Sequence, residues 1–114
     1  MPKLISQKNF SNIVVVNYTT TTTNQSVIDS FSRKRFQSAK YQIQVESNNN
    51  YQTTELLVVH DNTTTYITEY GTILTQESLA SFTADISGNT LRLLATPVNS
   101  TTTKFKVIRK AINA

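Results

Sequence analysis

Alternation of apolar and polar residues with a period of two is the feature that most limits the fold of this chain. Between residues 36 and 47, Tyr41, Ile43 and Val45 alternate with glutamine and glutamate residues. Successive side chains of a β-strand point to opposite faces, so we expect the three apolar side chains on a core face. A helix would instead need apolar residues three and four positions apart. The segment is therefore predicted to be a strand.

The same pattern continues to the end of the chain, with short turn signals between the segments. Asn48-Asn49-Asn50, Asp61-Asn62 and Ser87-Gly88-Asn89 are typical of turns, and Gly71 indicates a bulge or bend within a strand. Further strands are predicted at residues 51–60, 64–75, 79–86, 89–96 and 102–110. Short strands joined by tight turns favour an all-β fold, either an antiparallel β-sandwich or a barrel-like closed sheet.

The first 29 residues have a different character. Residues 11–18 and 25–31 could each form a strand, which gives about six to eight strands in all. Between them lies a tract of five threonines, whose β propensity is high but whose two faces are alike, so its register is weakly specified. It could be a linker, an edge strand or an extended arm. We interpret residues 1–29 as an N-terminal arm and residues 30–114 as the β-sandwich domain.

The apolar run of the arm is the candidate docking segment. A strand can add to the exposed sheet edge of a neighbour, where main-chain hydrogen bonds supply the affinity. Deletion of residues 1–24 should then abolish binding while the domain stays folded. The run consists of Ile13, Val14, Val15 and Val16.

Composition excludes several classes of function. Ser, Thr, Asn and Gln supply 48 of the 114 residues, and the chain has no cysteine. Without cysteine there is no disulfide framework, no thiolate nucleophile and no cysteine-based metal site. No apolar stretch approaches the 18 to 20 or so residues that span a bilayer, so a membrane partner is not expected.

The net charge is +4, and two basic clusters contribute to it. A mildly basic balance suits an acidic protein surface. Nucleic acid is not an expected partner, because no aromatic-flanked RNA-binding motif accompanies the clusters. The clusters, both interpreted as contact sites, are Arg33, Lys34 and Arg35, and Lys104, Lys106, Arg109 and Lys110.

Residues with catalytic potential are few. His60, the only histidine, lies next to Asp61, where a strand is predicted to meet a turn. Glu55 and Glu69 lie in neighbouring predicted strands and are the only pair that resembles the two carboxylates of a glycosidase. Two glycines cannot build a phosphate-binding loop. We therefore predict that the protein is not an enzyme, with no catalytic residue, metal or cofactor.

Residues 30–112 resemble a β-rich domain of virion structural proteins from tailed phages of marine bacteria, especially cyanophages. About 80 residues share the order of motifs with that family. The resemblance implies a structural role in a virion. Its anchors are Ser38-Ala39-Lys40-Tyr41, Thr54-Glu55, His60-Asp61, Thr68-Glu69-Tyr70-Gly71, Ala84-Asp85-Ile86-Ser87-Gly88 and Arg92-Leu93-Leu94.

The resulting functional hypothesis is a capsid decoration protein, made in a host cytoplasm and bound in many copies to the major capsid protein or other virion proteins. It would assemble as a homo-oligomer or multi-copy array. An alternative with the same fold is a tail, neck or fibre component. A second alternative is a carbohydrate-binding adhesion module, for which Tyr66 and Tyr70 on one strand face are the main candidates, beside Tyr18 and Tyr51.

Overall fold

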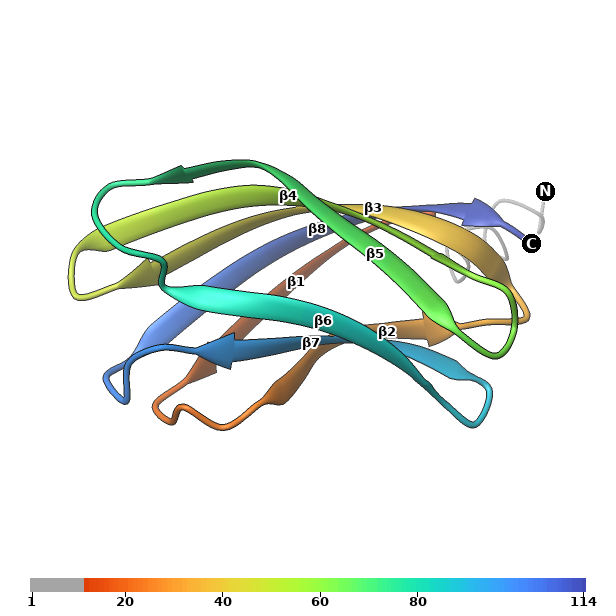
Figure 1. The fold of residues 1–114 in the computed structure, drawn as a ribbon, viewed down its shortest axis with the longest axis horizontal. Coiled ribbons are helices and arrows are strands. Elements are labelled where there is room, and N and C mark those ends of the chain that lie inside the picture. Colours follow the sequence, from red (N-terminus) through yellow and green to blue (C-terminus); the bar gives the residue numbers. More distant parts are fainter. Residues whose placement is uncertain (1–11) are drawn as a thin grey trace, which may run out of the picture.

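The computed structural model describes residues 12–114, which form eight antiparallel strands in two sheets (Figure 1). This confirms the predicted all-β sandwich, and the predicted strands recur with their ends shifted by a few residues. The strands are β1 (Ile13–Thr20), β2 (Ser26–Ser32), β3 (Phe36–Ser47), β4 (Asn50–His60), β5 (Thr65–Leu74), β6 (Ala80–Ser87), β7 (Thr90–Pro97) and β8 (Thr103–Asn113).

The larger sheet has the strand order β1-β8-β3-β4-β5, and the smaller one has the order β2-β7-β6. β1 pairs with β8 along its whole length, from Ile13 opposite Lys110 to Thr20 opposite Thr103. Figure 1 shows the red β1 and the blue β8 side by side, although they come from opposite ends of the sequence. The described part of the segment interpreted as an arm thus contributes β1 and most of β2, and residues 1–11 lie outside the described residues.

Two hairpin turns follow the turn chemistry of the sequence. Ser47 pairs with Asn50, and the two residues between them, Asn48 and Asn49, have φ of 53° and 62°. Positive φ at both central positions is the geometry of a type I′ turn, which matches the right-handed twist of the flanking strands. In the hairpin between β6 and β7, Gly88 has φ of 62°, which glycine adopts without a steric cost.

The core lies between the two sheets and is built by the predicted alternation. Tyr41, Ile43 and Val45 are fully buried, as are Leu91 and Leu93 of the facing sheet. Gly71 produces the predicted bulge, because the pairing of β4 with β5 shifts register opposite it.

Candidate interaction surface

One face of the five-stranded sheet points away from the smaller sheet, and we call it the outer face. Ten large apolar side chains are exposed there: Tyr51, Ile73 and eight others that are each between 38% and 66% exposed. Monomeric soluble proteins rarely expose a contiguous apolar patch of this kind unless it binds something. We call this set the apolar patch: Ile13, Val15, Leu57, Val59, Tyr66, Tyr70, Ile108 and Ile112.

A shallow hollow of about 870 Å³ lies within the patch. Side chains from all five strands line it, among them Ile13, Leu57, Tyr66 and Ile112. Because the hollow crosses the strands near the start of β1 and the end of β8, it brings the first described residues of the chain together with its last strand.

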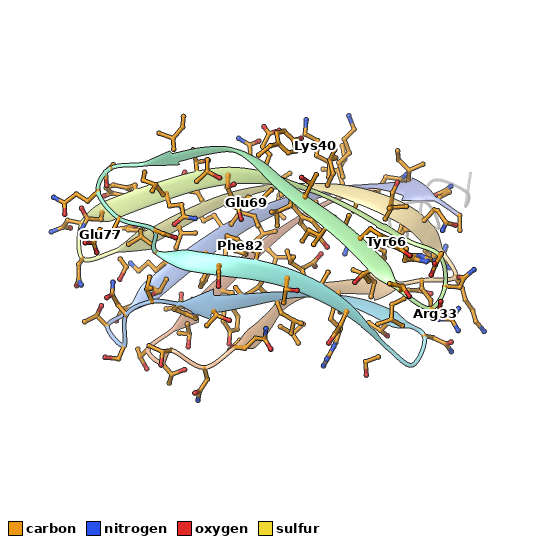
Figure 2. All side chains as sticks on the ribbon, in the orientation of Figure 1. Arg33, Lys40, Tyr66, Glu69, Glu77 and Phe82 are labelled. Atoms are coloured by element: carbon orange, nitrogen blue, oxygen red, sulfur yellow. The ribbon has the colours of Figure 1, made fainter. Side chains whose placement is uncertain are left out.

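The basic cluster predicted on the last strand is divided between the two faces of the sheet. Lys104, Lys106 and Lys110 are exposed on the outer face, whereas Arg109 points into the sandwich and is 7% exposed. Lys40 faces Lys110 across the β3–β8 pair, and in Figure 2 Lys40 stands on the side of the sheet away from β6. The lysines therefore form a cationic outer surface from which Arg109 is absent.

Lys40 belongs to a small polar group on the same face. Its Nζ lies 3.4 Å from Glu55 Oε1. A hydrogen bond from Tyr70 is the main cause that lowers the pKa of Glu55, with Lys40 adding to the effect. The same hydrogen bond raises the pKa of Tyr70. Glu55 is therefore held ionised beside the apolar patch.

Arg109 instead joins a buried polar cluster that sequence reasoning missed. Its Nη1 lies 3.0 Å from Asp29 Oδ2 and donates to the carbonyl of Ser30, and Tyr41 donates to the same carboxylate oxygen at 2.8 Å. Burial, and then the Asp29 charge, raise the pKa of Tyr41. Arg109 Nε has no hydrogen-bond partner in the structure, while its guanidinium lies 5.4 Å from the centre of the Phe31 ring. The sequence pattern could have revealed this, because alternation along the strand places Arg109 on the same inward face as Phe105 and Val107.

The other predicted basic cluster lies in the turn between β2 and β3. Arg33 donates hydrogen bonds to the carbonyl of Gly88 and to the side-chain oxygens of Asn62 and Asn89. Lys34 and Arg35 are exposed in the same turn. Arg33 thus ties three loops together at one end of the molecule, where Figure 2 places it.

The residues considered for catalysis have hydrogen-bonding partners within the protein. His60 is 2% exposed, and its Nδ1 accepts from the Asn62 amide, which leaves Nε2 to donate to the Phe36 carbonyl at 2.8 Å. Hydrogen bonds from the backbone amides of Thr64 and Thr63 lower the pKa of Asp61 to about 2. The carboxylate therefore stays ionised and fixes its turn.

The two carboxylates weighed as a glycosidase pair do not face each other. Glu55 pairs with Tyr70 on the outer face, whereas Glu69 pairs with Leu56, whose side chain is buried. Glu69 accepts hydrogen bonds from Thr54 and Thr72 beside the Gly71 bulge. Neighbouring positions of a strand pair point to opposite faces, so the two carboxylates do not form a glycosidase-like pair.

Within residues 12–114, no group of three or more histidine, cysteine, aspartate or glutamate side chains is placed to hold a metal ion. That part of the chain also has no helix long and apolar enough to cross a membrane.

Comparison with known proteins gives likeness of fold only. No family model matches the sequence, and no curated protein matches it. Among solved structures, the tailspike protein of Acinetobacter phage vB_ApiP_P1 superposes with a TM-score of 0.50 and 21% identity over 90% of this chain. The tailspike of Acinetobacter baumannii phage AM24 gives a TM-score of 0.43 at 7% identity, and tailspike gp49 of phage Fri1 gives 0.35 at 20%.

These matches cover 94% and 95% of the chain for AM24 and Fri1. The chain spans only 22%, 27% and 21% of the three tailspikes, in the order named. The fold of this chain is therefore similar to that of a minor part of the vB_ApiP_P1 tailspike. The neighbours come from Acinetobacter phages, so the marine, cyanophage-type origin stays a prediction.

The prediction that the protein is not an enzyme is contradicted by these neighbours. The Fri1 tailspike is named as a capsular polysaccharide depolymerase, which is an enzyme, and this chain matches 21% of it. The prediction came from the scarcity of catalytic side chains in 114 residues, a criterion that says nothing of a larger protein in which such a domain occurs.

Proposed function

We propose that this chain is a structural domain of a phage tail, of the kind found in tailspike proteins. The observation that carries the proposal is the fold shared with the vB_ApiP_P1 tailspike over 90% of this chain. Because the chain spans 22% of that tailspike, it has the extent of one module rather than of a complete spike. The tail alternative is thereby better supported than capsid decoration.

The outer face supports a role in protein–protein contact within the particle. It combines the apolar patch with four lysines and two glutamates among the described residues. The excess of lysines suits an acidic virion protein as the neighbour, since complementary charge steers association and disfavours wrong partners. Apolar side chains at the centre of such a contact would supply most of the affinity.

Localisation within the particle tests the proposal. Gold-labelled antibodies against this chain should mark the tails of purified virions, and quantitative mass spectrometry should find far fewer copies than of the major capsid protein. Labelling spread over the head, with a copy number comparable to the capsid lattice, would support decoration and overturn the proposal.

A second candidate function is polysaccharide binding, favoured by the placement of Tyr66 and Tyr70 on the outer face of β5. They are 55% and 38% exposed, and four residues along a strand separate their rings by about 13 Å. Affinity electrophoresis in gels with polygalacturonate or dextran checks this. Tyr66→Ala should remove any retardation seen with the wild type, with Tyr51→Ala as the exposed-tyrosine control. Equal mobility of the wild type with and without both polymers would exclude binding to them.

A further inference from the structure

The four edge strands of the sandwich differ in how their unpaired backbone groups are protected. Exposed edges normally carry a bulge, a charge, a proline or a cover, because an unprotected edge pairs with other chains. β5 has the bulge at Gly71, and β2 has a register shift between Val27 and Asp29. On β6, the carbonyls of Ala84 and Ala80 accept hydrogen bonds from Thr65 and Gln52.

Among residues 12–114, we find none of these devices on β1. Its eight residues, IVVVNYTT, include no charge, proline or glycine, and its register with β8 is regular from end to end. The Ala111 amide donates to the Asn12 carbonyl at 2.7 Å. This bond shows which residues of β1 form hydrogen-bonded pairs with β8, because bonded and non-bonded pairs alternate along an antiparallel ladder. Even-numbered residues of β1 therefore bond β8, and the N–H and C=O groups of Val15, Asn17 and Thr19 point to the open side.

We propose that the β1 edge binds the β1 edge of a second copy of this chain, antiparallel about a two-fold axis. With Val16 on the axis, Val15 of each copy lies opposite Asn17 of the other, and both pairs can exchange N–H···O=C bonds in both directions. The two larger sheets then join into one continuous sheet. The pairing does not depend on the proposed tail function.

Charge favours this arrangement over stacking of the two outer faces. Edge pairing brings together only uncharged positions of β1. The β8 lysines of the two copies then lie three strand spacings apart, about 14 Å. That distance exceeds the screening length of about 8 Å at physiological ionic strength. Face-to-face stacking centred on the hollow would instead bring Lys40 and Lys110 of one copy against those of the other, with Glu55 already paired to Lys40.

Analytical ultracentrifugation of the 114-residue chain tests the pairing from micromolar to millimolar concentration. The wild type should show a monomer–dimer equilibrium. Val15→Lys adds a charge at a position that is 66% exposed, and it should weaken the dimer at least tenfold. Val98→Lys, in the β7–β8 loop at 57% exposure, is the matched control and should dimerise like the wild type. Thermal melting of each variant checks that it is folded.

Three results would overturn the proposal: a monomer at every concentration, a larger closed oligomer, or a dimer that Val15→Lys leaves intact and Lys110→Glu alters. A cross-link gives a second, register-specific test, because the chain has no cysteine of its own. Val16→Cys should form a covalent dimer on oxidation, since directly opposed non-bonded pairs have Cα atoms about 4.5 Å apart, within disulfide range. Val98→Cys should stay monomeric. Failure of Val16→Cys to cross-link in the dimer would contradict the two-fold register.

Discussion

Arg109 shows that a residue's odd or even position along a strand decides whether its side chain lies in the core or in solvent. Its position in β8 places it with Phe105 and Val107 on the inner face, where the side chains of those two neighbours are buried. Removing a guanidinium from water is costly unless a partner carboxylate and further hydrogen bonds compensate, and here Asp29, Ser30 and the aromatic rings do so. The residue thus serves the interior of the sandwich rather than the contact surface.

Replacement of Arg109 by methionine should destabilise the protein by about 3–5 kcal/mol, because the buried Asp29 would lose its cationic partner and keep only the hydrogen bond from Tyr41. The double variant Asp29→Asn, Arg109→Met should be more stable than Arg109→Met alone. Urea unfolding measures both. Arg92→Met is the control: it breaks the exposed pair with Asp85, whose atoms lie 2.6 Å apart, and should cost at most about 1 kcal/mol. Equal destabilisation by Arg109→Met and Arg92→Met would contradict the buried-pair explanation.

Asp61 gives a pH-dependent prediction at the same scale. Its folded-state pKa of about 2 lies below the ordinary value of 3.8, so the unfolded state takes up a proton first as the pH falls. The stabilisation is therefore complete above about pH 5 and is mostly lost by about pH 2. Melting temperatures of the wild type and Asp61→Asn should differ at pH 6 and converge toward pH 2. A difference independent of pH would show that the charge is not responsible.

At the scale of the strands and turns, local sequence predicted most of what the structure contains. Alternation identified the inward residues of β3 and β8, and Gly71 identified the bulge in β5. These features succeed because each depends on residues adjacent in the chain. The position of Asp29 could not be found in this way, since its partner Arg109 lies 80 residues further along the chain.

The β3–β4 turn yields a prediction of its own. Asn49 has φ of 62°, a conformation that glycine tolerates better than any residue with a Cβ atom. Asn49→Gly should leave stability unchanged or raise it by about 0.5 kcal/mol, whereas Asn49→Ala should lower it by about 1 kcal/mol. Thermal unfolding of the two variants compares them directly. A stability of Asn49→Ala equal to that of Asn49→Gly would argue against the type I′ geometry.

At the scale of the whole molecule, the unpredicted information is which strands pair. β1 joins β8, β2 joins β7, and β3 joins β8, so three of the six strand pairings connect segments distant in the sequence. Alternation specifies which face a residue occupies, but it does not specify the neighbouring strand. The sequence therefore supported an arm over residues 1–29, while β1 lies along an edge of the larger sheet and Tyr18 packs against the core.

This topology changes the expected result of truncation. Deletion of residues 1–24 removes β1, uncovers the outer edge of β8 and takes away the contact between Tyr18 and Phe105, whose ring centres are 6.3 Å apart. We expect that variant to lose several kcal/mol of stability or to aggregate, since it exposes a long strand edge next to uncovered core. Deletion of residues 1–11 retains all eight described strands and should unfold close to the wild type. Circular dichroism melting and light scattering distinguish the two. If removal of residues 1–24 left a folded, soluble monomer with an unchanged melting temperature, β1 would be dispensable to the sandwich and its role would be confined to binding.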